Sequence, residues 1–385
     1  MLKALKLGDE VKAEEILRDY DTKITKKMVL AAAKRGGAKC LDLLIQNGAD
    51  LKFRVRDTRM TLLHVVCESR YADAEVVDVL IRNGGLDANA STRFLKSTPL
   101  MIAIESLPAD IAVDIAETLI ENGANVNAGD DFNETALHNV SKQDDEYAEV
   151  ADVLIRNGAV VNAVNVDKVS ALHYAAQHGN VKIVKRLIRG GCDVDAVDKY
   201  CWRPLHQAAF ELDHRILKVL IENGADVNAV TQSNTSALYL AQQHRSDRLP
   251  RVLKMLIVSG ARVNAVEKNV YTAFHGAIQK NRMRTVLYFL CMGAAIDRRA
   301  LELEDPDEFE LLHRIKNRTL SPMFSPKEKK FLQNLALILL LDAGANPHLK
   351  NEMGLNSFDI SEKFGPFPSV TKMLLKYEDD NAVIE

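Results

Sequence analysis

Histidine is the residue of this sequence whose type and spacing come nearest to a chemical site. Six of the ten histidines stand at the end of one recurring motif, Thr-x-Leu-His or a variant of it. They are His64, His138, His173, His206, His275 and His313. Histidine is the common general base of enzymes and a common metal ligand. Six regularly spaced copies of one general base serve no single reaction, so the spacing favours a structural role.

Metal and nucleotide chemistry have still less support. Cys192, Cys201 and His206 are near one another, but no CxxC pair accompanies them. A closed zinc site needs four ligands. The sequence also lacks a GxxxxGK[ST] loop, a GxGxxG motif after a strand and a GxSxG elbow. We therefore predict no catalytic residue, no metal site and no cofactor.

The segments that carry the histidines repeat along the chain. In the centre the period is 33 residues, because Leu172 and Gly191 of one copy correspond to Leu205 and Gly224 of the next. Each copy predicts a first helix of small residues and a second helix with apolar residues at three- and four-residue spacing. One copy cannot bury its apolar stripe alone, so several must stack.

Local signals predict where the helices begin and end. Pro204 suits the first turn of a helix, and Ser170 suits the position just before one. Gly179 and Gly191 suit the left-handed residue that ends a helix. In the copies that end at Gly84 and Gly123, extra residues are expected between the two helices.

This pattern resembles the ankyrin repeat. The resemblance rests on the start motif, as in Thr98-Pro99-Leu100-Met101 and Thr135-Ala136-Leu137-His138, on the paired alanines and on the GA-x-V-N-A ending. It covers nearly the whole chain as about eleven units, including degenerate caps. It implies an all-α repeat solenoid of helix-turn-helix repeats joined by β-hairpin-like fingers. It also implies that the motif imidazoles bond to neighbouring backbone and tie adjacent repeats together.

We expect a single array over residues 1–377. Its expected parts are an N-terminal cap at residues 1–22, a loop inserted in the tenth repeat at 317–330 and a C-terminal cap at 348–377. An acidic tail at 378–385 follows. A basic turn with Arg245, Arg248, Pro250 and Arg251 is expected between the helices of the eighth copy.

The resemblance also implies a partner surface, because ankyrin partners generally dock on the concave side, formed by finger tips and first helices. Carried over by position, it assigns ten residues to partner binding. They are Tyr174, Gln177, His178, Lys199, Tyr200, Trp202, Gln207, Phe210, Glu211 and Tyr271. Aromatic residues are only 6% of the chain, and Trp and Tyr favour interface hot spots. Packing between fingers is the alternative for Trp202, and Cys201 and Arg203 replace the usual finger glycine and threonine.

Charge is unevenly distributed along the chain. The net charge is +5 over residues 1–60, −12 over 61–160, +9 over 161–300 and −5 over 301–385. Such bands can orient a charged partner. The first hypothesis is a non-catalytic adaptor, inhibitor or effector that binds a protein. A substrate receptor of a ubiquitin-ligase complex is the second, and electrostatic binding of nucleic acid or anionic membrane by a basic edge in residues 182–284 is the third.

Composition and cysteine usage limit the class and compartment. A chain that is 47% hydrophobic and 27% charged is typical of a folded protein without a membrane span. The charged N-terminus does not resemble a secretory signal. The cysteines are Cys40, Cys67, Cys192, Cys201 and Cys291, an odd set without paired spacing. We expect reduced thiols, a monomer and a cytoplasmic or nuclear location, or delivery into a host cell for an effector.

Overall fold

The computed structural model describes residues 1–7, 9–19, 23–55, 60–243, 246–267, 272–279, 285 and 289. The chain forms two compact units, Met1–Ala261 and Arg262–Glu385. Nearly all described elements belong to the first unit; the second contributes α17 (Ala273–Gln279). The predicted loop at 317–330, the cap at 348–377, the acidic tail and Tyr271 lie outside the described residues.

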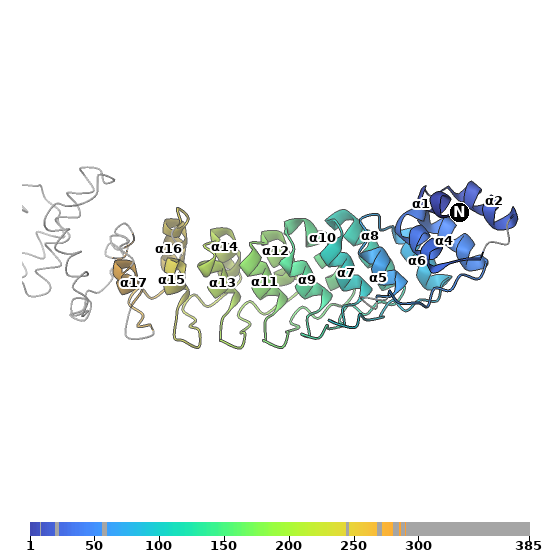
Figure 1. Cartoon of the computed structure of the whole chain (residues 1–385). Helices are drawn as coiled ribbons and strands as arrows, with labels where there is room; N and C mark the ends of the chain where they lie inside the picture. The colour runs from blue at the N-terminus through green and yellow to red at the C-terminus, as the bar shows by residue number, and fades with distance from the viewer. Residues whose placement is uncertain are drawn as a thin grey trace, which may run out of the picture. The chain divides into compact units, whose positions relative to one another are not determined.

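The first unit is a row of helix pairs (Figure 1). The first helices of the pairs are α3 (Lys26–Ala31), which continues as the π-helix η1 (Ala32–Gly36), α5 (Leu62–Cys67), α7 (Pro99–Ser106), α9 (Ala136–Lys142), α11 (Ala171–His178), α13 (Pro204–Phe210) and α15 (Ala237–Leu240), which continues as η3 (Ala241–Gln243). The second helices are α4 (Gly37–Gln46), α6 (Ala74–Arg82), α8 (Ala109–Glu121), α10 (Ala148–Arg156), α12 (Val181–Arg189), α14 (His214–Glu222) and α16 (Leu249–Val258). The array of helix pairs is as predicted.

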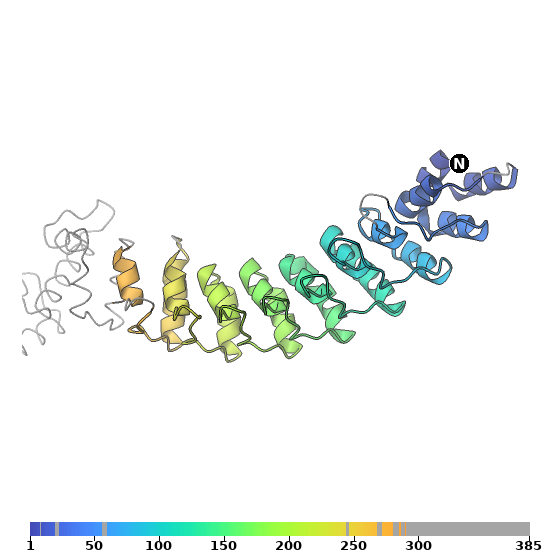
Figure 2. The ribbon, with the colours of Figure 1, turned by 60° about the horizontal axis from the view of Figure 1, so that its bottom comes forward.

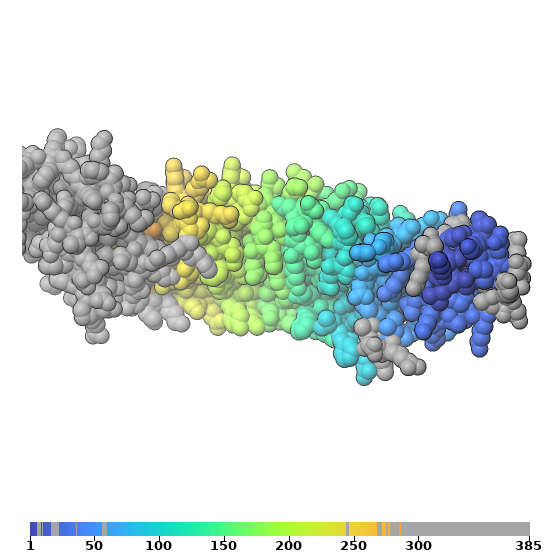
Figure 3. Space-filling view, turned by 45° about the horizontal axis from the view of Figure 1, so that its top comes forward, coloured from blue at the N-terminus to red at the C-terminus, as the bar shows by residue number. Residues whose placement is uncertain are grey.

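The pairs stack through both rows of helices. Helix α11 packs on α9 and α13, its neighbours in the first row, and α12 packs on α10 and α14 in the second. Figure 2 shows the same row of helix pairs with the lower side of Figure 1, where the fingers lie, turned toward the viewer. In the space-filling view, the side chains of successive repeats pack against one another (Figure 3). The thin alanine face explains this close approach, because Ala175, Ala176, Ala208 and Ala209 are fully buried.

The row begins with α1 (Leu2–Leu7) and α2 (Glu10–Asp19), where the N-terminal cap is expected. Helix α1 packs on α3 and η1, and α2 packs on α4. The π-helical turn at η1 has no counterpart in the sequence-based expectation.

The predicted fingers connect the repeats. Four of them are closed by a backbone hydrogen bond of 3.0 Å across the tip: Asp130 N–H to Glu134 O, Asn165 N–H to Val169 O, Asp198 N–H to Trp202 O and Thr231 N–H to Thr235 O. Neighbouring fingers bond to each other as well: Val166 N–H to Phe132 O, 3.0 Å; Lys199 N–H to Asp167 O, 2.9 Å; Gln232 N–H to Tyr200 O, 2.8 Å. The fingers therefore form a continuous hydrogen-bonded row along one side of the helices (Figure 1).

The local signals are confirmed in the central repeats. Pro204 opens α13 in its first turn, and Ser170 precedes α11 in extended conformation. Gly179 and Gly191 end their helices with φ of 82° and 83°. These are left-handed conformations, which glycine adopts without strain.

The prediction for the extra residues is right in one copy and wrong in the next. Residues 68–73 do lie between α5 and α6. In the fourth copy only Leu107 and Pro108 separate the helices, and the extra residues lengthen α8 to 13 residues, against 9 in α12. Pro108 stands just before α8, where proline is well tolerated, and the buried stripe from Ala112 to Leu119 stabilises the longer helix.

Candidate partner-binding surface

The motif imidazoles hold neighbouring repeats together. In each, Nδ1 accepts a backbone N–H at the residue before the helix: Thr61 to His64, 3.3 Å; Thr135 to His138, 3.1 Å; Ser170 to His173, 3.2 Å; Arg203 to His206, 3.0 Å. Each Nε2 lies 3.0 or 3.1 Å from a carbonyl oxygen of the following segment: Ser97, Val169, Trp202 and Ala229, respectively. The bridging role that the resemblance implied is confirmed for these four; the side chain of His275 and all of His313 lie outside the described residues.

These imidazoles are neutral in the folded chain. Burial lowers the pKa of His64, His138, His173 and His206, and the carbonyl at Nε2 only partly offsets it. A neutral ring with Nε2–H donating and Nδ1 accepting satisfies both bonds at once. No imidazole of this set is therefore free to act as a base toward a substrate.

The Trp202 cluster, defined as Tyr200, Trp202 and Phe210, lies where the seventh finger meets α13. The Trp202 ring is half-buried and meets Phe210 edge-on, with centroids 5.9 Å apart. It also meets His206 edge-on at 6.2 Å. The Trp202 backbone is fixed on both sides, since its N–H donates to Asp198 Oδ1 at 2.8 Å and its carbonyl accepts from His173. The Trp202 ring thus packs within its own repeat and is partly open to solvent.

Tyr200 is the most exposed ring of this cluster, with 54% of its surface accessible. Lys199 Nζ lies 4.9 Å from the centre of that ring and 2.6 Å from Asp167 Oδ1 on the neighbouring finger. The lysine is therefore held between an aromatic face and a carboxylate, and the ring stays on the outside.

The Tyr174 cluster, defined as Glu134, Lys142, Asn165 and Tyr174, lies one repeat earlier. Glu134 is only 8% exposed. Its carboxylate pairs with Lys142 Nζ and accepts hydrogen bonds from Tyr174 Oη, 2.6 Å, and Asn165 Nδ2, 3.2 Å. Lys142 Nζ also lies 4.5 Å from the centre of the Tyr174 ring. Two successive repeats, the fifth with Glu134 and Lys142 and the sixth with Asn165 and Tyr174, meet in this one polar group.

The charges in the Tyr174 cluster are mutually stabilised. Burial acts to raise the pKa of Glu134, but the donors from Lys142 and Tyr174 outweigh it and hold this pKa below its ordinary value. Burial and the adjacent carboxylate raise the pKa of Tyr174 well above the ordinary range. The cluster therefore contains an ionised glutamate and a neutral phenol whose hydroxyl is already in use.

The remaining predicted residues lie on helix ends of the same row. Gln177 and His178 are exposed at the end of α11, Gln207 is half-buried in α13, and Glu211 is exposed just after it. Residues 174, 177 and 178 share one helix face, as do 207, 210 and 211, because positions three and four apart are neighbours. The structure thus brings nine of the ten predicted residues to the fingers and first helices of the sixth and seventh repeats.

The basic edge is only partly available. Arg186 pairs with Asp152 at 3.0 Å, while Lys182, Lys185 and Arg189 are exposed on α12. The basic turn expected in the eighth copy is wrong in part, because α16 begins at Leu249 with Pro250 in its first turn. Arg245, Lys280, Arg282 and Arg284 lie outside the described residues.

Two searches across the described residues give negative results. None of their helices is long and apolar enough to cross a membrane. No group of three His, Cys, Asp or Glu side chains in the described part of the chain is placed to hold a metal ion. Cys40, Cys67, Cys192 and Cys201 form no disulfide bond within the described part of the chain.

The family follows from comparison with known sequences. The family model for ankyrin repeats (3 copies) matches residues 28–130, 112–198, 137–231 and 205–300, and together these matches span more than half of the chain. The protein belongs to the ankyrin-repeat family, and its fold is the all-α repeat solenoid that the sequence predicted. Ankyrin repeats are generally protein–protein interaction modules. A search of curated proteins finds no match.

Proposed function

We propose that this chain is a non-catalytic adaptor or inhibitor that binds a partner protein on the finger and first-helix surface of the sixth and seventh repeats. The observation that carries the proposal is the Trp202 cluster, where Tyr200 is exposed on the seventh finger and the half-buried rings of Trp202 and Phe210 meet edge-on. Large rings that are already ordered cost little entropy on binding and favour hot spots.

The surroundings of the cluster define the partner's chemistry. Lys199 pairs with Asp167 beside the Tyr200 ring, and Glu211 is exposed directly after Phe210, so the surface around the rings carries both signs of charge. A partner with an apolar centre and a mixed polar rim fits this arrangement. The chain acts as a monomer in the cytoplasm or nucleus, and its role is to hold or mask the partner.

The test is affinity capture from cell lysate with identification of the bound proteins. The Trp202→Ala, Phe210→Ala variant is compared with the unmodified chain and with a matched control, Phe94→Ala, Leu95→Ala, which removes two exposed apolar side chains from the fourth finger. We expect one protein or complex to be lost in the first variant and retained in the control. Equal capture by all three chains, or equal loss in both variants, contradicts the proposal; a thermal melt of each variant shows that it is folded.

A further inference from the structure

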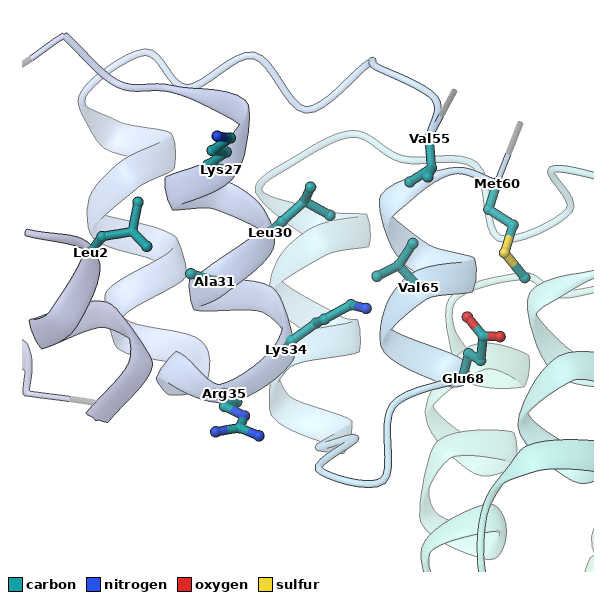
Figure 4. A pocket seen from close by; sticks show the side chains of 10 residues that line it. All are labelled: Leu2, Lys27, Leu30, Ala31, Lys34, Arg35, Val55, Met60, Val65 and Glu68. Carbon is teal, nitrogen blue, oxygen red and sulfur yellow. The ribbon is translucent and has the colours of Figure 1, made fainter. Parts of the chain in front are cut away.

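A groove of about 460 Å³ lies at the N-terminal end of the first-helix row, away from the Trp202 cluster (Figure 4). Its floor is apolar and comes from segments far apart in sequence. The floor residues are Leu2 of α1, Leu30 and Ala31 of α3, Val55 and Met60 of the following finger, and Val65 of α5. In Figure 4, Leu30 of α3 and Val65 of α5 point into the space between these two helices, while Leu2 and Ala31 lie on the α1 side of α3.

One wall of the groove has unusual helix geometry. After Ala31 the α-helix continues as the π-helix η1, which contains Lys34 and Arg35. A π-turn closes hydrogen bonds from i to i+5, and such turns are frequent at functional sites. Here the turn lies where η1 packs on α5, and it places both cationic residues on the rim.

The rim is positively charged. Lys27, Lys34 and Arg35 line it, and Glu68 is the one acidic residue among the described residues of the lining. Lys27 and Lys34 are exposed, and neither has an ion-pair partner within the described part of the chain. The Arg35 guanidinium lies 4.9 Å from the centre of the Tyr71 ring, which holds it in place. An apolar floor beneath unpaired cations suits a ligand with aliphatic side chains flanked by carboxylates.

We propose that this groove is a second docking site, and that its occupant is an acidic peptide segment of a partner protein with aliphatic anchor residues. The anchors occupy the floor between α3 and α5, and the carboxylates lie at Lys27, Lys34 and Arg35. A nucleic acid fits less well, because its bases stack on aromatic rings and the lining residues that the structure describes include none. The site is independent of the surface around Trp202.

The probe is a random peptide display library of about 12 residues per member, a length that spans a groove of this kind, selected on the full chain at low salt. Selected peptides are then measured by fluorescence polarisation. Lys27→Glu, Lys34→Glu reverses the rim charge, and Ala31→Phe fills the floor without a charge change. Lys182→Glu, Lys185→Glu is the matched control, since it makes the same charge change on the exposed face of α12. Circular dichroism melting checks that each variant is folded.

We expect enrichment of acidic peptides with aliphatic residues. Their affinity falls about tenfold or more in either groove variant, because Lys27→Glu, Lys34→Glu reverses two rim charges and Ala31→Phe blocks the apolar floor. It is unchanged in the control and in the Trp202→Ala, Phe210→Ala variant, which separates this site from the proposed function. The proposal is overturned if no selected peptide loses affinity in the groove variants, or if the peptides that do lose affinity lack acidic residues. It is also overturned if no such acidic peptide is found and the chain instead binds single-stranded RNA or phosphatidylserine vesicles in a way that Lys27→Glu, Lys34→Glu abolishes.

Discussion

The Tyr174 cluster and the Trp202 cluster lie one repeat apart on the same row of fingers and first helices, yet they use their aromatic rings differently. Tyr174 donates its hydroxyl hydrogen to Glu134, inside a group that joins the fifth and sixth repeats. Tyr200, at the exposed tip of its finger, is 54% accessible and lies under Lys199. The same kind of residue thus stabilises the array in one repeat and is presented to solvent in the next.

The comparison shows that position in the repeat is not enough to assign a binding role. Both residues belong to the row of fingers and first helices on which ankyrin partners generally dock. What separates them is a buried carboxylate: Glu134 has only 8% of its surface exposed and needs donors, because an unpaired buried charge is costly. No such requirement holds the Tyr200 ring, so its exposure is available for binding.

The largest expected effect concerns the buried motif imidazoles, which are present in the repeats of both clusters. Burial lowers the pKa of His138 and His206, as it does for His64 and His173. Below the ordinary histidine pKa of about 6.5, the unfolded chain therefore binds more protons than the folded one. The free energy of unfolding is fully present above this pH and falls on acidification, by up to about 1.4 kcal/mol per pH unit for each imidazole.

Urea unfolding at pH 7.0, 6.0 and 5.5 measures this slope. The His173→Asn variant, although less stable, has a shallower slope by about one proton. The lowered pKa of Glu134 and of Asp213 adds a further loss only in the more acidic range where carboxylates titrate. A free energy of unfolding that does not change between pH 7 and 5.5 contradicts the neutral, buried imidazoles.

The second prediction separates the clusters by charge. Lys142→Met leaves the buried Glu134 without its ion-pair partner, and we expect a loss of about 2–3 kcal/mol in unfolding free energy, below the full value for a buried pair because Lys142 is partly exposed. Lys185→Met on the exposed face of α12 is the control and changes stability by less than about 0.5 kcal/mol. Equal urea midpoints for the two variants show that the cluster does not stabilise the array.

The third prediction compares the two phenols directly. Tyr174→Phe removes a donor from an ionised carboxylate and lowers unfolding free energy by about 1–2 kcal/mol. Tyr200→Phe removes a hydroxyl from an exposed ring and leaves the melting temperature nearly unchanged. A similar decrease in melting temperature in both variants would contradict the different roles of the two phenols.

The smallest effect is at the tip of the seventh finger. Cys201 is exposed and has φ of 58°, a left-handed conformation that suits glycine better. Cys201→Gly is therefore expected to raise unfolding free energy by about 0.5 kcal/mol. Leu212 has φ of 56° but is only 2% exposed, so Leu212→Gly destabilises through lost burial. Destabilisation by Cys201→Gly, measured by thermal melting, contradicts the strain.

Features that repeat were predictable from the sequence. The imidazoles of His173 and His206, the start at Pro204 and the stop at Gly191 recur at one period, so each copy reinforces the prediction for the others. The finger geometry at Cys201 could not be predicted, because cysteine stands there in place of the usual glycine. In the structure this finger has the same hydrogen bonds as its neighbours, since Cys201 adopts the left-handed conformation.

Features without periodicity were not predictable. The Tyr174 cluster joins Glu134 and Lys142 of the fifth repeat to Asn165 and Tyr174 of the sixth, and no local sequence pattern marks such a contact. The spacing of the fourth copy showed extra residues but not that they extend α8, since Pro108 fits a turn and a helix start equally well. The π-turn at η1 also has no sequence signal, so the groove beside it is seen only in three dimensions.

The measurement that tests the central claim most directly is a calorimetric titration of the captured partner into three chains: unmodified, Trp202→Ala, Phe210→Ala, and Tyr174→Phe. We predict that the first variant weakens the Kd about a hundredfold, or about 3 kcal/mol, and that Tyr174→Phe changes it less than about threefold despite its lower stability. An unchanged Kd in the Trp202→Ala, Phe210→Ala variant, or equal weakening by Tyr174→Phe, contradicts the assignment of the Trp202 cluster as the binding surface.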